Sequence, residues 1–366
     1  MWVWTLSPDF NIVLQKRIGI KVQKSSAEKV RKFLLERSLL DKNLRVKRTE
    51  SHVVFPLSRE PSSEDLQTLK EIADVSFVVE NFEKVRIGPR SIKEVLAGKI
   101  PEDALAEVRR SFDIIGDIAV IEVPQEVMRY GEEIGRAIMR VHKNVRAVFA
   151  KVGPVDTEFR VRKLIHIAGD KRTTTIHREH GCLFYVDVAN VYFSPRLSTE
   201  HLRVASQVSD NEVVIDMFTG VGPFAILIAK RTASTVFAID KNPHAIECLR
   251  RNIELNKLKG EVIPLLGDAR DIVPSRLRGK ATRVIMNLPL YAHQFIDVAC
   301  IGLRSEGGIV HFYTITGGQD PKGEAVEILR KGVERSGRIL EEILSTRVVR
   351  EYAPRKWQVV VDGRIR

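Results

Sequence analysis

The sequence predicts an α/β protein whose C-terminal part is a doubly wound, Rossmann-like sheet. Residues 212–222, Glu-Val-Val-Ile-Asp-Met-Phe-Thr-Gly-Val-Gly, run from an apolar strand through Asp216 into a glycine-spaced turn. An apolar helix follows at Pro223–Lys230, and a second strand ends at Asp240, just before Lys241. Glycines after the first strand let the backbone approach a ligand, and a carboxylate ending the second strand binds ribose hydroxyls. This order indicates a site for a nucleoside-containing cofactor.

The glycine pattern alone leaves the kind of cofactor open, and one acidic residue decides it. Gly220 and Gly222 are followed by Ala225 where a dinucleotide site often has a third glycine, which is a permitted variant. Asp216 would repel a pyrophosphate but suits the cationic amino acid moiety of S-adenosylmethionine (SAM). Phe218 is expected to pack near the cofactor or to belong to the core. The alternative is an α/β core that binds no cofactor and uses these glycines only in its turns.

Later strands in the same region strengthen the prediction of a SAM site. A third strand at Val262–Gly267 ends in Asp268-Ala269, which is expected to reach the adenine, and a fourth at Arg283–Met286 ends in Asn287-Leu288-Pro289. The remaining expected elements are helices Ala292–Leu303 and Lys322–Gly337 and strands Ile309–Thr314, Ile339–Arg350 and Lys356–Val361. Seven strands with one antiparallel strand in the terminal pair are typical of SAM-dependent methyltransferases.

Two smaller α+β domains are predicted before this sheet, giving domains at 1–85, 90–195 and 196–366. The first has strand and helix patterns from Asn11 to Glu80, and the second contains a buried strand within 113–123 and an amphipathic helix at Glu132–His142. Other expected strands of the second domain are Ala147–Lys151, Thr174–His177 and Cys182–Asp187. A polar linker is expected near Arg86–Ser91, which contains Gly88-Pro89.

The charge distribution indicates a nucleic-acid partner. The 366 residues carry a net charge of +12, and the excess is uneven. Residues 1–50 hold twelve Lys and Arg against five Asp and Glu, and residues 140–180 hold ten against four. Such patches are typical of proteins that bind a phosphate backbone. A solvated basic surface of a thermophilic protein is the alternative.

Several classes of protein are disfavoured by the composition. No apolar run approaches the length of a membrane span, and the N-terminus lacks the layout of a secretion signal. Cys182, Cys248 and Cys300 are scattered without metal-ligand spacing, so we expect no metal site and a reducing, cytoplasmic setting.

Three local motifs contain candidate catalytic or binding residues. Asn287-Leu288-Pro289 follows the strand beside the expected methyl group, where amide and backbone oxygens can hold a planar nitrogen nucleophile; a plain strand-to-helix turn is the alternative. Thr199-Glu200, taken alone, suits a helix N-terminus. Arg160, taken alone, is a phosphate contact or part of a solvated strand face.

Together these motifs resemble one family. The runs are Ser111–Ile118, Phe159–Arg162, Tyr192–Glu200, Asp216–Gly222 and Asn287-Leu288-Pro289. In this order they resemble the archaeal and eukaryotic tRNA (guanine-37-N1)-methyltransferases. The resemblance covers roughly residues 100–320 and is specific in its combination of motifs.

The resemblance implies methyl transfer from SAM to N1 of the guanosine next to the anticodon. N1 of neutral guanine carries a proton, so a general base must remove it. By similarity Glu200 is that base, and Arg160 donates to guanine O6, where negative charge develops. Tyr192 and Asn287 would position the base, and Pro289 would shape its pocket.

The resemblance also implies further binding roles. His201 stands where many archaeal members have Arg, and it should lie near the SAM carboxylate, as a weaker anion partner than Arg. The first domain should recognise the outer corner of the tRNA while the other two hold the anticodon loop. The expected protein is a monomer.

Other functions remain open at this point. The related enzyme that transfers the aminocarboxypropyl group of SAM to the wyosine precursor at the same tRNA position shares the fold. A second activity, methylation of a wyosine intermediate, is compatible with the sequence. A non-catalytic tRNA chaperone is disfavoured because the strand-end carboxylates and the Asn287 motif are present. The basic segments argue against a small-molecule or protein methyltransferase.

Overall fold

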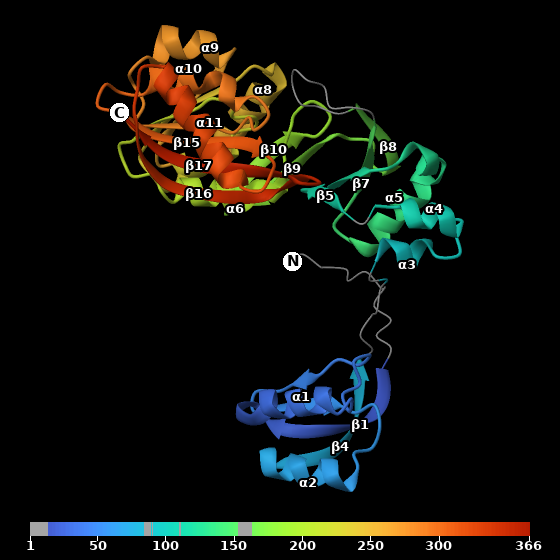
Figure 1. Ribbon diagram of the computed structural model, residues 1–366. Helices are drawn as coiled ribbons and strands as arrows, with labels where there is room; N and C mark the ends of the chain where they lie inside the picture. Colours follow the sequence, from blue (N-terminus) through green and yellow to red (C-terminus); the bar gives the residue numbers. More distant parts are fainter. Residues whose placement is uncertain (1–13, 84–88, 90, 110, 153–162) are drawn as a thin grey trace, which may run out of the picture. The chain divides into compact units, whose positions relative to one another are not determined.

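The computed structural model describes residues 14–83, 89, 91–109, 111–152 and 163–366 (Figure 1). The chain divides into two compact units, residues 1–90 and 91–366, and each is described by itself. The division into three domains stays a prediction. Most of the expected linker, Arg86–Ser91, lies outside the described residues. None of the helices within the described ranges is long and apolar enough to cross a membrane.

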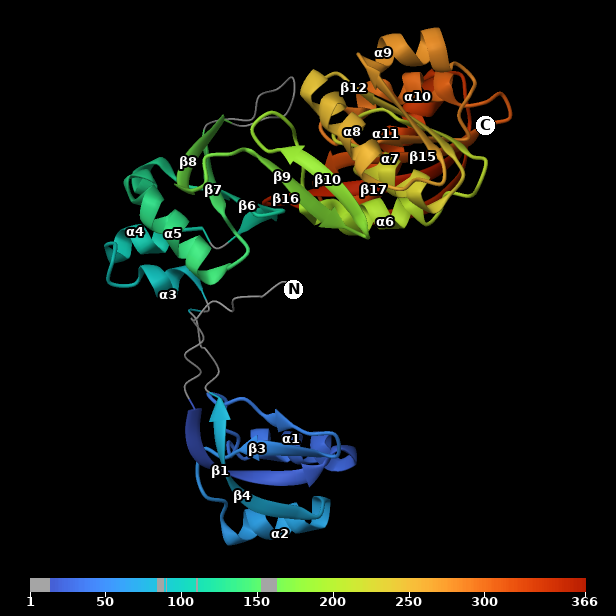
Figure 2. The same ribbon diagram turned by 180° about the vertical axis from the view of Figure 1, so that it is seen from behind.

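The first unit is an α+β module built on an antiparallel sheet. Its described strands form a four-stranded sheet in the order β2-β3-β1-β4 (Figure 2). The elements are β1 (Leu14–Gln23), α1 (Ala27–Glu36), β2 (Lys47–Arg48), β3 (His52–Pro56), α2 (Ser63–Ile72) and β4 (Val75–Glu83). Ser62 caps α2 in a reciprocal capping box with Asp65. Val30, Leu34 and Leu69 from the helices are buried against Ile20, so this unit has a core of its own.

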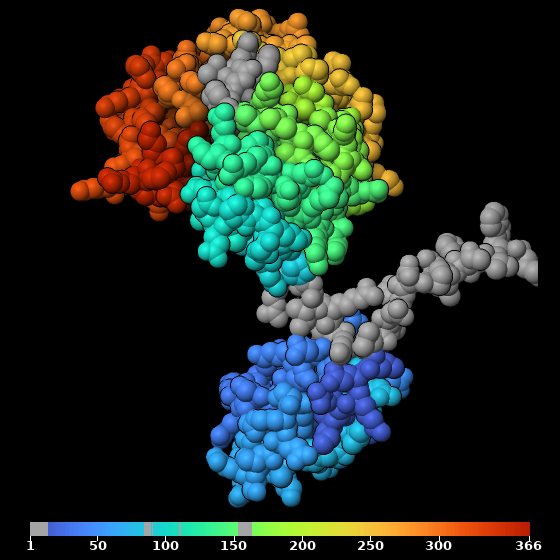
Figure 3. Space-filling view, turned by 90° about the vertical axis from the view of Figure 1, so that its right-hand side faces the viewer, coloured from blue at the N-terminus to red at the C-terminus, as the bar shows by residue number. Residues whose placement is uncertain are grey.

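The second unit begins with a mixed sheet covered by helices. Within the described part, its strands are ordered β5-β6-β7-β8. The elements are α3 (Ile92–Leu96), α4 (Glu102–Glu107), β5 (Phe112–Ile115), β6 (Ile118–Glu122), α5 (Gly131–Val141), β7 (Ala147–Val152) and β8 (Lys163–Gly169). Ile134 and Ile138 of the amphipathic helix α5 are fully buried, as their spacing predicts. In Figure 3 this segment, cyan to green, lies in front of the later part of the same unit. Ile118, Val120 and Phe149 of its sheet belong to one buried cluster with Phe184 and Val186.

The buried strand expected at the apolar end of residues 113–123 is confirmed as β6, in which Ile118–Ile121 are buried. The chain reaches it from its antiparallel neighbour β5 through a tight turn. Gly116 has φ 58°, and a Cβ there would overlap Thr175 Oγ1 and the backbone of Ile176. The turn therefore needs glycine both for its left-handed conformation and for close approach to β9 (Thr174–Glu179).

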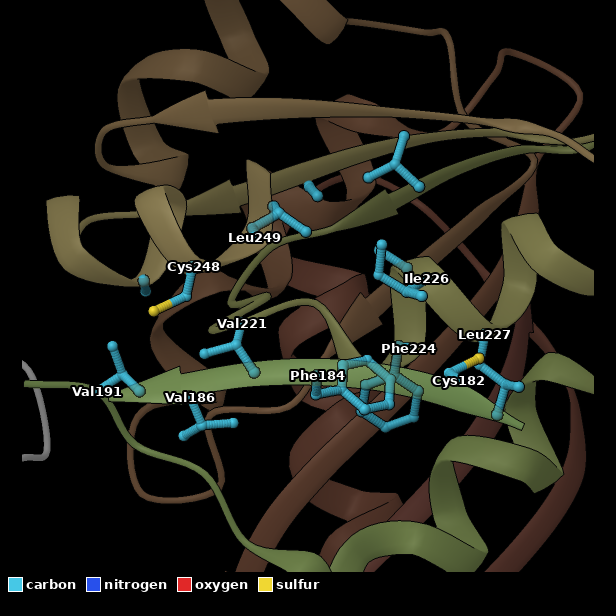
Figure 4. Packing of buried hydrophobic residues seen from close by; sticks show 14 of the residues in the cluster. Cys182, Phe184, Val186, Val191, Val221, Phe224, Ile226, Leu227, Cys248 and Leu249 are labelled. Carbon is cyan, nitrogen blue, oxygen red and sulfur yellow. The ribbon is translucent and has the colours of Figure 1, made fainter. Parts of the chain in front are cut away.

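The hairpin of β9 and β10 (Cys182–Asp187) packs into the core of the methyltransferase-like sheet. Figure 4 shows Cys182, Phe184 and Val186 of β10 facing Phe224 and other apolar side chains. Two amides of α8 (Pro243–Leu255 and its C-cap) extend this contact to the backbone. Asn252 exchanges two hydrogen bonds with Tyr185, at 2.6 and 3.2 Å, and Asn256 exchanges two with Leu183, at 3.0 and 2.8 Å.

The rest of the second unit is the predicted seven-stranded sheet. In the described residues its order is β13-β12-β11-β14-β15-β17-β16, and β17 runs antiparallel to both neighbours while β11 to β15 are parallel. The elements are α6 (Ser198–Ala205), β11 (Val213–Asp216), α7 (Pro223–Arg231), β12 (Thr235–Asp240), β13 (Glu261–Leu266), α9 (Ala269–Ile272), β14 (Arg283–Met286), α10 (Ile296–Gly302), β15 (Gly308–Thr316), α11 (Pro321–Arg335), β16 (Leu340–Ala353) and β17 (Lys356–Ile365). The strand order reverses at β11, so a ligand site is expected at its carboxyl end.

Candidate active site

A cavity of about 510 Å³ lies at the carboxyl ends of the central parallel strands. Most of the predicted cofactor residues line it. They are His201, Phe218, Gly220, Asp240, Lys241, Asp268, Ala269 and Asn287. Tyr192 lines the same cavity. Asp216 and Gly222 do not line it, although the residues between them do. The fold therefore brings the four strand-end motifs together.

The glycine loop after β11 is tied to the carboxylate that ends β12. Gly220 and Gly222 have φ 56° and 88°, a region in which glycine is favoured. The backbone N–H of Gly220 donates to Asp240 Oδ2 at 2.7 Å. A Cβ at Gly222 would overlap Leu249 Cδ1, so this residue lets α7 begin close to α8. Burial raises the pKa of Asp240. Ligand hydroxyls donating to Asp240 would compensate for the loss of water at this carboxylate.

Asp216 is a buried acid whose only neighbouring donors among the described residues, Thr219 and the backbone of Phe218, do not reach it in ordinary hydrogen-bond geometry. It is fully buried, and neither carboxylate oxygen has a hydrogen-bond partner among the described residues. Burial raises the pKa of Asp216 to about 7. Thr219 and Asn287 line the cavity. Their side-chain oxygens, Oγ1 and Oδ1, are also buried and have no hydrogen-bond partner among the described residues. These buried oxygens would be stabilised by a cationic ligand group that donates hydrogen bonds. The ammonium group of SAM is such a group, so the residues fit the amino acid moiety of SAM.

We expect the protonation of Asp216 to change when a cationic ligand binds. At about pH 6.5, below its raised pKa, the carboxyl is mainly protonated, and a nearby ammonium favours the ionised form. Binding of S-adenosylhomocysteine should therefore release protons near this pH. Calorimetry in buffers of different ionisation enthalpy measures the release. The Asp216→Asn variant should release fewer protons, and equal release by both proteins would contradict the assignment.

Part of the cavity wall is aromatic. Phe218 and Phe295 meet edge to face with ring centroids 4.9 Å apart. Arg270 lies over the Phe295 ring at 4.8 Å and donates to both oxygens of Asp268. The hydrogen bonds from Arg270 lower the pKa of Asp268. Phe295 and Arg270 were not predicted from the sequence. Arg270 could have been found because it follows Asp268 by two residues, within reach of it.

Glu200 does not line the cavity. It is buried on α6, and its Oε2 accepts from Arg203 Nε at 2.9 Å and from the Tyr313 hydroxyl at 3.1 Å. Its Oε1 lies 3.3 Å from Arg347 Nη2. The role of general base therefore stays a prediction. Arg203, Tyr313 and Arg347 were not anticipated, because they come from α6, β15 and β16 and no local motif links them.

Arg203 connects Glu200 to a buried polar network. Its guanidinium binds both oxygens of Asp362 on β17. Asp362 Oδ1 lies 2.6 Å from His311 Nδ1, and Arg283 Nη1 lies 2.9 Å from His311 Nε2. Since guanidinium can only donate, His311 Nε2 accepts and the imidazole is neutral. Burial lowers the pKa of His311, in agreement with this assignment.

The remaining predicted residues are placed as follows. The hydroxyl of Tyr192 lies 3.4 Å from Arg350 Nη2. Pro289 does not line the cavity, and its carbonyl accepts from Ile315 N at 3.2 Å. Arg160 lies outside the described residues. Among the residues that the structure does describe, no group of three or more His, Cys, Asp or Glu is arranged to hold a metal.

A second cleft of about 590 Å³ adjoins the cavity. The two share a wall made by Tyr192, Phe193, Ser194 and Tyr291. Cationic side chains from both parts of the unit line the cleft, together with the aromatic Phe112 and Tyr352. The cations are Arg109, Lys151, Arg196 and Arg350, and the acids Asp113, Glu122 and Glu351 also line the cleft. Asp113 holds two of them, with Arg196 Nε at 2.7 Å and Lys151 Nζ at 3.3 Å. Cations with aromatic faces suit a nucleic-acid strand.

The sheet with its antiparallel β17, the glycine loop and the strand-end cavity define a Rossmann-like methyltransferase of the SAM-dependent class. The chain belongs to the TRM5/TYW2 methyltransferase family. Residues 175–339 match the TRM5/TYW2 methyltransferase domain, residues 92–173 the TYW2 N-terminal domain, and residues 19–65 the tRNA methyltransferase 5 N-terminal domain. The family inferred from the sequence motifs is thus confirmed.

Relatives and solved structures extend the match to nearly the whole chain. The tRNA (guanine(37)-N(1))-methyltransferase Trm5b of Pyrococcus abyssi is 42% identical, over 95% of this chain and 99% of the relative. The structure of aTrm5 in complex with tRNALeu has a TM-score of 0.70 at 36% identity, covering 95% of this chain and all of that one. A tRNA(Phe) (4-demethylwyosine(37)-C(7)) aminocarboxypropyltransferase of Methanocaldococcus jannaschii is 36% identical, over 68% of this chain and 96% of the relative.

Proposed function

We propose that the protein is a tRNA (guanine(37)-N1)-methyltransferase that uses SAM. The geometry that carries this proposal is the shared wall, Tyr192–Ser194 with Tyr291, between the cofactor cavity and the cationic cleft. A nucleotide in the cleft can present its base to the cavity across this wall. The Pyrococcus abyssi relative, alignable over 95% of the chain, carries the same activity in its name.

The reaction needs a base, a hydrogen-bond donor and correct positioning. When bound, SAM would supply the methyl group, whose bond to sulfur breaks so that the sulfonium becomes the neutral thioether of S-adenosylhomocysteine. Glu200 accepts the N1 proton of guanine as the bond from N1 to that carbon forms, and Arg160 donates to O6, where negative charge develops. Tyr192 and Asn287 hold the purine, and Pro289 shapes the turn beside it. The base must leave its stack, which costs less in a loop than in a duplex.

Glu200 can serve as the base only if one of its oxygens becomes free. Its Oε2 is held by Arg203 and Tyr313, whereas Oε1 has Arg347 as its partner among the described residues. The Arg347 side chain is 41% exposed and can turn toward solvent or toward a phosphate. We therefore assign proton transfer to Oε1, with Arg347 moving away when RNA binds. Arg203 and Tyr313 keep the carboxylate in place.

Aminocarboxypropyl transfer at the same tRNA position is the alternative function. It breaks a different bond to sulfur and requires no base for guanine N1, so a buried carboxylate beside the cofactor cavity favours methylation. The match to the aminocarboxypropyltransferase covers 68% of this chain, less than the match to the methyltransferase. Methylation of a wyosine intermediate is compatible with the same site as a second activity.

The first unit is proposed to recognise the outer corner of the tRNA. Residues 1–50 carry its charge excess, and residues 19–65 match the N-terminal domain of tRNA methyltransferase 5. The protein is proposed to act as a monomer in the cytoplasm. All three cysteines are free and buried, which suits a reducing compartment.

Deleting residues 1–90 should weaken discrimination among tRNAs and leave cofactor binding intact. The first unit has its own core, and the cavity is lined by residues of the second. Competition between cognate and non-cognate transcripts measures discrimination, and calorimetry with S-adenosylhomocysteine measures binding. Loss of cofactor binding, with the melting curve of the remaining unit intact, would contradict the assignment.

A methyl-transfer assay on unmodified transcripts tests the proposed function. Transcripts bearing G at position 37 should gain one methyl group at N1, and transcripts bearing A should gain none. Mass spectrometry of the digested RNA separates methyl from aminocarboxypropyl addition by the added mass. An aminocarboxypropyl product, or methylation elsewhere, would overturn the proposal.

A further inference from the structure

His201 is backed by a buried carboxylate. Its ring lines the cofactor cavity and is 2% exposed, and its Nδ1 lies 2.6 Å from Oε1 of Glu179 on β9. Glu179 is itself 6% exposed and does not line the cavity. Its other oxygen, Oε2, is buried without a hydrogen-bond partner among the described residues. A buried carboxylate in this position needs a cation.

The neighbouring imidazole cannot supply that charge. His177 Nε2 lies 3.9 Å from Glu179 Oε2, but His177 Nδ1 accepts from the backbone N–H of Gly116 at 3.1 Å. An imidazole nitrogen that accepts carries no proton, so His177 is neutral. Burial lowers the pKa of His177, in agreement. Of the two imidazoles that face Glu179, this leaves His201, at 2.6 Å from Oε1, as the one able to carry a balancing charge.

The charged groups around this pair leave His201 as the anion partner at its end of the cavity. The cations lining the described cavity wall are His201, Lys241 and Arg270. Lys241 follows Asp240, and Arg270 is bonded to Asp268, so both belong to the strand ends that face the nucleoside.

The other titratable groups packed around the pair are neutral or bound to partners other than Glu179. On β10, burial raises the pKa of Cys182, so it stays a neutral thiol. On α7, Lys230 donates to the carbonyl of Gly181 at 2.6 Å. On α6, Glu200 is held by Arg203 and Tyr313. Phe224 of α7 meets the His201 ring edge to face, at 4.7 Å between centroids.

We propose that Glu179 is a positioning residue that keeps His201 protonated, so that His201 binds the carboxylate of the cofactor's amino acid moiety. Nδ1–H donates to Glu179, which directs Nε2–H toward the cavity. This inference rests on the proposed SAM cofactor. It assigns a role in cofactor binding to Glu179, which does not line the cavity itself. It explains how a histidine can serve as the anion-binding group at this position.

A binding experiment on the full-length chain tests the role of Glu179. The probes are S-adenosylhomocysteine, which has the amino acid carboxylate, and 5′-methylthioadenosine, which lacks it. Glu179→Gln should lower the affinity for S-adenosylhomocysteine about tenfold, which is the loss expected for a charge-assisted hydrogen bond. The affinity for 5′-methylthioadenosine should stay within about twofold because that ligand does not use His201.

A double-mutant cycle separates charge from packing. Arginine is charged without help, so in the His201→Arg background Glu179→Gln should leave S-adenosylhomocysteine affinity almost unchanged. Equal weakening of both ligands, no weakening of either, or the same loss in the His201→Arg background would overturn the proposal. None of these outcomes depends on tRNA methylation, so failure of the proposed activity is distinguished from failure of this inference.

A spectroscopic measurement covers the case in which the arginine variant does not fold. In protein labelled with ¹⁵N-histidine, the His201 ring of the S-adenosylhomocysteine complex should show imidazolium signals near neutral pH, assigned with His201→Asn. In Glu179→Gln the signals should move to those of a neutral ring. A neutral His201 in the wild-type complex would also overturn the proposal.

Discussion

Glu200→Gln is expected to lower the rate of methyl transfer by about 10²–10⁴-fold, the contribution usual for one general base. The amide oxygen of Gln can still accept from Arg203 and Tyr313, so the side chain keeps its place. It cannot take a proton from guanine N1. Because Glu200 does not line the cavity, cofactor affinity should be unchanged. Single-turnover kinetics on a tRNA transcript and calorimetry with S-adenosylhomocysteine measure the two effects.

The matched control for this experiment is Glu254→Gln. Glu254 is an exposed carboxylate on α8, in the same unit but away from the polar network. Its replacement should leave both measurements unchanged. If the Glu200 variant turned over at a near-normal rate, Glu200 would be a structural partner of Arg203, and the proton would leave N1 by another route.

Asp362→Ala should be the most destabilising of these substitutions. Burial alone would raise the pKa of Asp362, but hydrogen bonds from His311 and Arg203 outweigh it and hold the pKa well below its usual range. Removing the carboxylate leaves Arg203 as a buried cation whose remaining acidic partner is Glu200. Breaking a buried ion pair in this way costs about 3–5 kcal/mol. Urea unfolding monitored by circular dichroism measures the loss.

The exposed Asp103 of α4 provides the control, since Asp103→Ala should change stability by no more than about 0.5 kcal/mol.

The same network makes the stability of the fold depend on pH. His311 is neutral in the fold and its pKa is lowered, so the unfolded chain binds more protons below about pH 6.5. The stability from His311 should be complete above that pH and fall as the pH drops. A Asp362→Ala variant as stable as wild type would show that the pair contributes no net stability.

The strand-end part of the site could be predicted from sequence because the fold repeats a local rule. Parallel strands end at one edge of the sheet, so Asp240, Asp268, Asn287 and the loop after Asp216 meet there once each strand is recognised. The antiparallel terminal strand was predicted from the sheet typical of SAM-dependent methyltransferases. Local sequence patterns could not show which residues form ion pairs with the buried charged side chains. Arg203 meets Asp362 across 159 positions, and only the packing of α6 against β17 brings them together.

Local pattern found the buried strand β6 but not its partner β5, which precedes the turn at Gly116. The close approach of this turn to β9 depends on tertiary packing and leaves no local signal in the sequence. The helices α3, with 5 residues, and α4, with 6, are too short to show a helical period and were missed, as was strand β8. Glu179 could not be connected with His201 before the β9–β10 hairpin was known, because the two are 22 positions apart.

The two amides of α8 that pair with β10 have a consequence for how the molecule behaves at high concentration. An open strand margin offers N–H and C=O groups to any other chain, and this is a common start of aggregation. Asn252 and Asn256 occupy those groups at Tyr185 and Leu183 from within the same molecule. A two-stranded hairpin is thereby shielded from intermolecular association by two side chains, without an additional strand.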